Sequence, residues 1–430
     1  MQSSSAVNGA CLLLKMTLWI APLLLLCPLL QAQVDSRAAE IQAARAQRAQ
    51  HLVREEPILI ERGLNFAEDT KILERITLGV AGFRPKLGGL VTGSGFALGP
   101  EYSRRDLARG EVIFRGAAQS SFTGYRKFDL QFTLPGFAND RLFLDLYSAR
   151  INYPRINYYG PGPDSRKSSR SNYRREGAEF HGTFGVRPFR HLKVGGSLGY
   201  LLVNVGPGTD PTLISAEKAF SPAEAVGIDR QADFFRQGTF VQYDTRDNPG
   251  GPRSGGNYIV EFSNYIDQDL GRHDFQRLDV NLQQYIPFFN KRRVIALRGK
   301  TVLTFQDDDQ LVPFYLQPVL GGSDDLRGFR NFRFHDDNLI VVNAEYRWET
   351  FAGLDMAVFA DAGKVFPRRS QWNFADVEGS VGFGLRFNVH NNVFLRLDVG
   401  FSHEGFQVWF KFSDIFGEGL IGSPSTQSIF

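Results

Sequence analysis

The sequence predicts an all-β membrane protein, a 16-stranded antiparallel transmembrane β-barrel preceded by a short N-terminal periplasmic helical segment. From about Phe83 onward, apolar residues fall on every second position in segments of 9–14 residues. Strands of soluble sandwiches average about five or six residues, whereas crossing a bilayer takes about 9–11. The chain also starts with a secretory signal and holds 38 Phe and 14 Tyr for interfacial girdles. A soluble all-β protein is the alternative, which the strand length disfavours.

Residues 1–32 have the pattern of a signal peptide. Lys15 precedes an apolar run that ends in Gln31-Ala32-Gln33, a cleavage site of the usual small-residue type. The run is about 15 residues, shorter than the roughly 20 that a spanning helix needs. Both cysteines, Cys11 and Cys27, lie inside the signal peptide, so we expect a mature chain without disulfides.

Residues 33–75 are expected to be a periplasmic helical lead-in. The stretch from residue 35 to residue 56 is rich in Ala, Arg and Gln, which favour helix. A helix that docks near the barrel mouth and a solvated linker both fit this composition.

Charge and motif content exclude several classes of function. The 49 basic and 46 acidic residues are spread along the chain without a basic block, so nucleic acid is not an expected partner. The chain has no P-loop, no G-x-S-x-G and no H-E-x-x-H, and its seven histidines are scattered, so we expect no enzyme, cofactor or metal. The acidic groups at 307–309 and 336–337 lack the spacing of a calcium loop and are interpreted as loop charge.

The barrel is expected to occupy residues 76–414, and residues 415–430 to form a C-terminal tail. Short connections alternate with long ones, as expected for periplasmic turns and outer loops. Counting back from the C-terminus gives 15 strands, and an even number requires one more within 76–91. The expected strands are 93–103, 111–120, 122–134, 141–150, 172–187, 192–205, 234–246, 255–267, 275–288, 292–305, 338–349, 354–366, 378–389, 393–402 and 405–414.

The last of these is the predicted closing strand, GFQVWFKF at 405–412. It begins at Gly405 and sets Phe406, Val408, Phe410 and Phe412 on one face, which we expect to meet lipid. The pattern resembles the outer-membrane sorting signal, although that signal normally lies at the very end of the chain.

The most specific motif is LGGSDDLRGFRNF at 320–332, with Leu326, Arg327, Gly328 and Phe329 at its core, followed by the strand NLIVVNAEYRWE. It resembles the signature loop of the bacterial outer-membrane assembly-factor superfamily, the BamA/TamA-like surface-antigen barrels. YDTRDNPGGPRSGGNYIVEF at 243–262 and FADAGKVF at 359–366 appear in the family's order. The resemblance implies a barrel in the bacterial outer membrane. Its implied partners are the lipid bilayer, client outer-membrane proteins or lipids, and periplasmic accessory proteins.

The family also implies a role for the loop. Its arginine folds into the lumen and pairs with a glutamate and an aspartate, which here are Glu345 and Asp361. A guanidinium in a partly desolvated lumen needs anionic partners, Gly328 permits a tight backbone path, and Phe329 packs the tip. The hypothesis is a lock that holds the loop inside the pore. The alternative is an outer loop with a solvated arginine.

Three functions follow as hypotheses. The first is insertion or translocation of proteins, or of lipids, through a seam between the first and last strands. If the Gly-rich stretch 88–99 forms the first strand, its glycines would weaken the pairing there. One departure bears on it, since residues 33–75 have no room for the family's periplasmic polypeptide-transport-associated domains. A passive or gated channel for small solutes and a surface-exposed structural or adhesive antigen are the alternatives.

Overall fold

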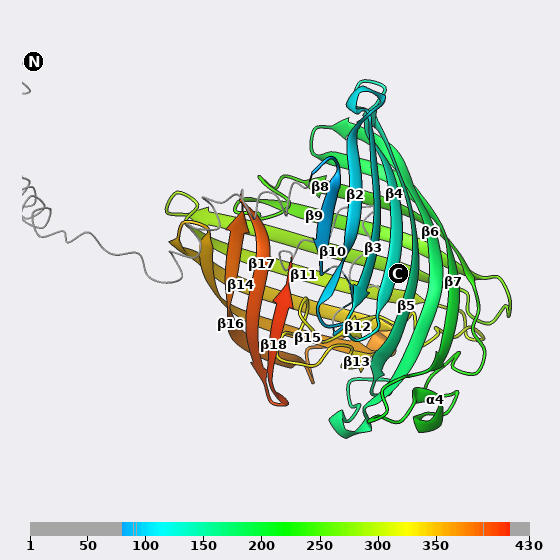
Figure 1. The fold of residues 1–430 in the computed structure, drawn as a ribbon. Coiled ribbons are helices and arrows are strands. Elements are labelled where there is room, and N and C mark those ends of the chain that lie inside the picture. Colours follow the sequence, from blue (N-terminus) through cyan, green and yellow to red (C-terminus); the bar gives the residue numbers. More distant parts are fainter. Residues whose placement is uncertain (1–79, 89, 92, 390, 413–430) are drawn as a thin grey trace, which may run out of the picture. The chain divides into compact units, whose positions relative to one another are not determined.

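A single antiparallel sheet dominates the molecule. The computed structural model describes residues 80–412 apart from 89, 92 and 390. Within this part, 16 strands form one sheet in chain order, and each strand between the first and the last pairs with the sheet strand before it and the sheet strand after it. Figure 1 shows the sheet curving from β1 in blue to β18 in red. The predicted signal (1–32), lead-in (33–75) and tail (415–430) lie outside the described residues.

The strands of this sheet have the following bounds: β1 Phe83–Leu87, β2 Ala97–Leu107, β3 Val112–Ser121, β4 Arg126–Phe137, β5 Leu142–Tyr158, β6 Ser171–Phe189, β7 Leu192–Pro207, β8 Phe234–Asp244, β9 Gly255–Asp267, β10 Phe275–Phe288, β11 Arg293–Phe305, β14 Asn338–Phe351, β15 Leu354–Phe366, β16 Glu378–Val389, β17 Asn392–Ser402 and β18 Gly405–Lys411. A second sheet pairs β12 (Val319–Leu320) with β13 (Phe334–His335). The short helical turns are η1 Ala108–Gly110, η2 Lys167–Ser169, α4 Ala216–Ala219 and η3 Arg369–Gln371. None of the helices in the described part has the length and apolar content to cross a membrane.

Alternation gives the large sheet two unlike faces. In β7, the even-numbered Leu198 and Leu202 are 48% and 37% exposed, whereas the odd-numbered Leu201 and Val203 are 4% and 8% exposed. The exposed face is apolar along most strands, and the buried face carries many charged side chains. A sheet that is apolar outside and ionic inside is the arrangement that a lipid-embedded barrel requires.

Several strand boundaries match the sequence prediction. Strands β9, β10, β15 and β16 begin and end at the predicted residues. The predicted loop 151–171 is shorter than expected, because β5 continues to Tyr158 and β6 begins at Ser171, and these two residues pair. With 17 and 19 residues, β5 and β6 are longer than a bilayer requires, so they extend beyond it.

The Gly-rich stretch 88–99 does not form the first strand. The first strand, β1, is Phe83–Leu87, inside the predicted window 76–91, and β2 begins at Ala97 rather than at residue 93. Between them Gly88, Gly93 and Gly95 have φ angles of +66°, +86° and +74°. Glycine reaches this left-handed region without a steric penalty, so this stretch makes the turn between the strands.

The closing strand is shorter than predicted. It ends at Lys411, so Phe412 lies one residue beyond it instead of within it. Phe406, Val408 and Phe410 are 64%, 49% and 67% exposed on the outer face, whereas Phe412 turns its ring toward Phe394, with centroids 5.8 Å apart.

The turn between β8 and β9 reaches strands that are distant in the sheet order. The Asn248 side chain donates to the Asn391 carbonyl oxygen at 2.7 Å, and the Val393 amide donates to the Gly250 carbonyl oxygen at 2.9 Å. Arg253 pairs with Asp355 at the start of β15, at 2.7 Å. This turn therefore connects β8 and β9 to β15–β17 at the end of the sheet that carries the short connections.

Candidate functional site

The long connection between β11 and β14 folds against the buried face of the sheet. Its Leu326 and Phe329 are fully buried in an apolar cluster with strand residues such as Leu339 and Val341. The Phe329 ring also lies 5.4 Å from the ring of Phe334 in β13. Apolar packing thus fixes the residues on both sides of Arg327, so that its guanidinium projects toward β14 and β15.

Arg327 contacts both acids that the sequence singled out. Its guanidinium donates to Asp361 at 2.9 Å from Nε and at 2.7 Å from Nη2, and to Glu345 at 2.6 Å from Nη1. The Arg327 backbone amide also donates to Asp361, at 3.1 Å. All three side chains are fully buried. The guanidinium lies 3.3 Å from the centroid of the Phe359 ring, which adds a cation–π contact.

These three residues belong to a larger buried charge network. Glu345 also accepts from Arg347 at 2.7 Å and from Arg386 at 2.8 Å, and Arg386 pairs with Asp398 at 2.6 Å. Acids and bases nearly balance, which buried charges require. The acidic members are Asp324, Asp325, Glu345, Asp361 and Asp398, and the basic members are Arg298, Arg327, Arg347, Arg386, Arg396 and Lys411.

The network also shifts the pKa of two loop residues. Burial by itself would lower the pKa of Arg327, but Asp361 and Glu345 outweigh burial and the pKa is raised. Burial would raise the pKa of Asp324, but Lys411 and Arg396 outweigh it and the pKa is lowered. Both residues therefore remain charged at neutral pH.

Two glycines allow the loop backbone to touch β17. A Cβ on Gly328 would lie 2.6 Å from the Phe401 carbonyl oxygen, and a Cβ on Gly400 would lie 2.3 Å from the Arg327 carbonyl oxygen. The Ser402 hydroxyl donates to the Gly328 carbonyl oxygen at 2.8 Å. Gly328 therefore serves close approach, as its place in the motif suggested, and Gly400 is the matching position on the strand.

The loop tip is bonded directly to the last strand. Trp409 Nε1 donates to the Arg327 carbonyl oxygen at 2.8 Å, and Lys411 pairs with Asp324 at 3.2 Å. Both side chains are on β18, on the face opposite the exposed Phe406 and Phe410. Any movement of the loop tip therefore acts on β18.

The two edges of the sheet are β1 and β18. Among the described residues β1 pairs with β2 alone, and β18 with β17 alone. With five and seven residues they are the shortest strands of this sheet. The two edges meet where a Cβ on Gly88 would lie 3.6 Å from the Phe412 Cβ, and where the rings of Phe96 and Phe412 lie 6.0 Å apart. The sheet is therefore not closed by a ladder of hydrogen bonds in this part of the chain.

Several network residues were not singled out from the sequence as partners of the loop. Asp398, Arg386 and Arg396 are among them, and Trp409 is a further partner of the loop that the motif did not indicate. Arg386 and Arg396 are paired opposite each other in β16 and β17. Two arginines facing each other in a lumen require acids between them, and this is the signal that could have located Asp324 and Asp398. Among the described residues no group of His, Cys, Asp and Glu side chains is arranged to hold a metal ion.

The fold and this loop define a bacterial outer-membrane β-barrel. A family model described as the Omp85 superfamily domain matches residues 109–412, and the chain belongs to that superfamily. A search of curated proteins finds no match.

Solved structures give the same fold. BamA from Haemophilus ducreyi lacking POTRA domains 1–3 matches with a TM-score of 0.56 at 17% identity, over 78% of this chain and 70% of that one. CdiB from Escherichia coli matches with a TM-score of 0.52 at 13% identity, over 76% of this chain and 61% of that one. The expected localisation in the bacterial outer membrane is confirmed by the family.

Proposed function

We propose that this barrel inserts or translocates proteins at the outer membrane through the seam between β1 and β18, and that the loop carrying Arg327 controls this seam. The observation that carries the proposal is the pair of short, unjoined edge strands among the described residues. Such an edge presents free amide and carbonyl groups that can template an incoming strand. In this proposal the protein acts without catalysis and uses client outer-membrane proteins as partners.

The contacts of β1 support a seam that can open without loss of the barrel. Two inward side chains of β1 form ion pairs with neighbouring strands on the β1 side of the seam. Arg84 pairs with Glu101 in β2, and Lys86 pairs with Asp129 in β4 at 3.3 Å. Separating β1 from β18 therefore breaks none of these ion pairs. Among the described residues, opening the seam breaks the contacts of Gly88 and Phe96 with Phe412.

The contacts of β18 support a link between loop and seam. Trp409 and Lys411 hold β18 to the loop tip, and the tip is held in turn by Glu345 and Asp361. With the loop locked, β18 is tied to β14 and β15. Release of the tip would leave β18 bonded to β17 alone, which favours exchange of its free edge with a client strand.

A disulfide across the seam tests the proposal. The 3.6 Å separation between the Phe412 Cβ and a Cβ on Gly88 is within the range of disulfides, so Gly88→Cys with Phe412→Cys places two thiols for bonding. The doubly substituted protein is reconstituted in vesicles, and folding of an unfolded client barrel is followed by its heat-modifiable gel mobility. We expect folding of the client to stop on oxidation and to return on reduction.

The matched control is each single cysteine treated with the same oxidant. Neither should lose activity, because neither can join the edges. Equal client folding with the seam cross-linked and with the seam reduced would refute the proposal.

A further inference from the structure

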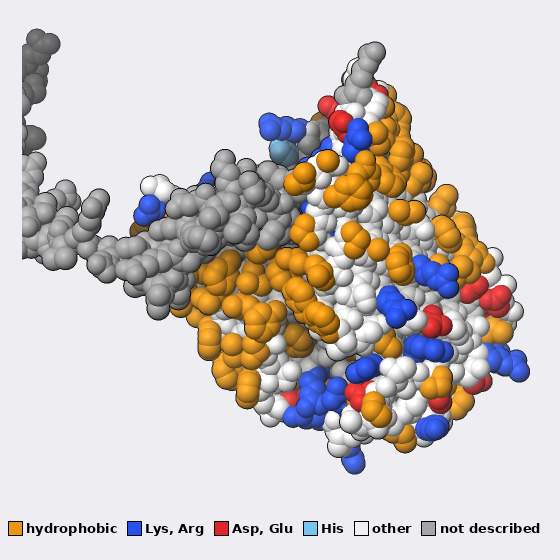
Figure 2. Space-filling view, viewed as in Figure 1, with side chains coloured by type: hydrophobic (Ala, Val, Ile, Leu, Met, Phe, Trp, Pro, Cys, Tyr) orange, Lys and Arg blue, Asp and Glu red, His pale blue; other side chains and the backbone are white. Residues whose placement is uncertain are grey.

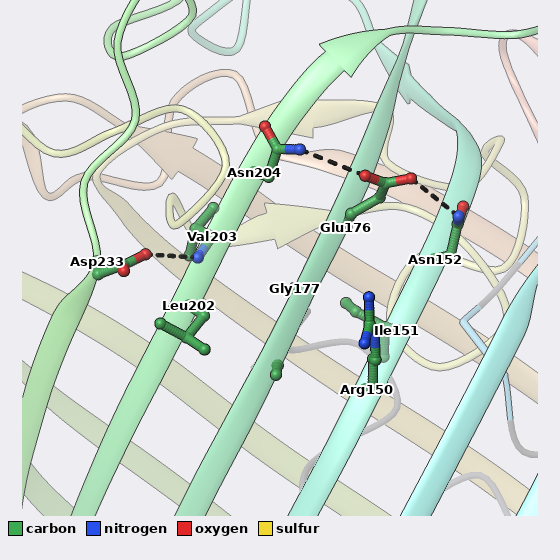
Figure 3. Close-up of a pocket in the computed structure, with 10 residues that line it drawn as sticks. Arg150, Ile151, Asn152, Glu176, Gly177, Leu202, Val203, Asn204 and Asp233 are labelled. Carbon is green, nitrogen blue, oxygen red and sulfur yellow. Dashed lines mark hydrogen bonds between the residues drawn. The ribbon is translucent and has the colours of Figure 1, made fainter.

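The outer face of β5, β6 and β7 carries a polar cluster at the end of the sheet with the long loops. Asn152, Glu176 and Asn204 are directly opposite one another in the registers of β5 with β6 and of β6 with β7. Both amides donate to the Glu176 carboxylate, at 2.9 Å from Asn152 and at 3.3 Å from Asn204. Figure 3 shows this carboxylate between the two amides. The cluster borders a hollow that is also lined by Arg150, Leu202 and Asp233.

Arginines surround this cluster on the outer face. Arg150 lies one step toward the centre of β5, opposite Ala178, and Arg126 on β4 is opposite Asn152. Both are exposed, and among the described residues no hydrogen bond or ion pair engages either guanidinium. Arg174 lies 3.7 Å from Glu176 and is 38% exposed in its side chain. The cluster therefore has an excess of positive charge beside two acids, Glu176 and Asp233.

An apolar groove continues from this hollow along the strands. Next to Arg150 and Ala178 come Ser148 opposite Phe180, and then Leu146 opposite Gly182. The small Ser148 and Gly182 form the floor of the groove, and larger side chains line its sides. These side chains are Leu130, Phe132, Phe180, Leu198 and Tyr200. In Figure 2 apolar side chains gather over the end of these strands away from α4, and charged ones over the end near α4.

We propose that this polar hollow and apolar groove together bind one molecule of a phosphorylated glycolipid in the outer leaflet. The alternation of short and long connections assigns the polar end to the outside. Arginine forks suit phosphate groups, and the amides and carboxylates of the cluster suit sugar hydroxyls. A lipid with phosphate but no sugar would leave Glu176 and Asp233 facing its negative charge. An acyl chain fills the groove, where the small residues leave room beside the aromatic rings.

The test uses the full-length protein in phosphatidylcholine nanodiscs that contain a small fraction of purified lipopolysaccharide or of phosphatidic acid. Retained lipid is identified by native mass spectrometry. We expect the protein to retain lipopolysaccharide selectively and Arg150→Ala to weaken this retention about tenfold, since one charge-assisted contact to phosphate is lost. Arg272→Ala is the matched control, because Arg272 is an exposed arginine in the connection between β9 and β10 at the same end of the sheet.

A second variant tests the groove separately. A Cβ on Gly182 would meet Leu146 at 3.4 Å, which is an ordinary contact, so Gly182→Leu can fold while it fills the groove. We expect it to weaken retention with the headgroup residues intact, and heat-modifiable mobility checks that the barrel has formed. Retention that is unchanged in both variants, or lowered equally by Arg272→Ala, would overturn the site. Phosphatidic acid held as tightly as lipopolysaccharide, with the same dependence on Arg150, would overturn the glycolipid assignment.

Discussion

Replacement of Arg327 by alanine perturbs the centre of the charge network, and its cost can be estimated from the contacts that remain. Glu345 keeps Arg347 and Arg386 at 2.7 and 2.8 Å, so it stays paired. Asp361 is 3% exposed and keeps only the neutral donors Asn343 and Ser380, at 2.8 and 3.2 Å, besides the backbone amide at position 327. A buried carboxylate that loses its cation costs about 3–5 kcal/mol.

The measurement is urea unfolding of the protein in lipid vesicles, followed by tryptophan fluorescence and by heat-modifiable gel mobility. We expect Arg327→Ala to lower the free energy of unfolding by about 3–5 kcal/mol. Arg327→Lys keeps the charge but cannot supply the two parallel bonds to Asp361, so we expect an intermediate loss. Arg272→Ala, at an exposed loop position, should change stability by less than about 0.5 kcal/mol.

A double-mutant cycle separates the ion pair from simple loss of packing. Asp361→Ala added to Arg327→Ala removes the stranded carboxylate, so the double variant should be more stable than the sum of the two single losses by about 1.5–3 kcal/mol. Planar bilayers give a second measure, since a released loop should raise the conductance of Arg327→Ala. A loss below about 0.5 kcal/mol together with an additive cycle would refute the reasoning.

Three further predictions concern the loops. Gly328→Ala places a methyl group 2.6 Å from a β17 carbonyl oxygen and 2.7 Å from a β16 side chain, so it should lower the free energy of unfolding in urea by about 1–3 kcal/mol. Gly299→Ala is the control, because a methyl group there meets no atom within 4 Å and should leave stability unchanged. Burial raises the pKa of Asp336 to about 7, so the folded protein holds a proton that the unfolded chain releases near pH 4. Stability should therefore fall as pH rises from about 4 to about 7, and Asp336→Asn should remove that part of the slope; an unchanged slope in urea titrations would contradict this. Arg253→Ala frees the turn between β8 and β9 from Asp355, so hydrogen exchange should accelerate across 247–256 and not in β10.

The strand pattern was predictable because period-two alternation leaves a direct trace in sequence. Segment 381–389, for example, sets glycine, arginine and asparagine opposite large apolar residues over its whole length. Tyr158 and Ser171 were assigned to a loop, since the expected strands ended at residue 150 and began at residue 172. Pairing continues there beyond the bilayer, and aromatic packing such as Tyr158 against Phe314, at 5.0 Å, stabilises it.

The first strand and the charge network were only partly predictable. Glycine has no side chain, so the Gly-rich stretch from Gly88 to Gly99 shows no alternation of polar and apolar residues that would mark the end of a strand. The turn there is set by the positive φ angles of its glycines, which the sequence does not show. The two acids near Arg327 were found through the family motif. The remaining members depend on which charges face each other across β16, β17 and β18, and register between strands is not visible along a single chain.

Cross-linking at the seam tests the central claim most directly. A photoreactive residue at Phe410, on the exposed face of β18, is compared with one at Ile286, an exposed apolar position on β10 in the middle of the sheet. An unfolded client barrel is added to the reconstituted protein, and the products are read after illumination. We expect the client to attach at position 410 and not at 286. Attachment at both positions alike, or at neither, would contradict insertion through the seam between β1 and β18.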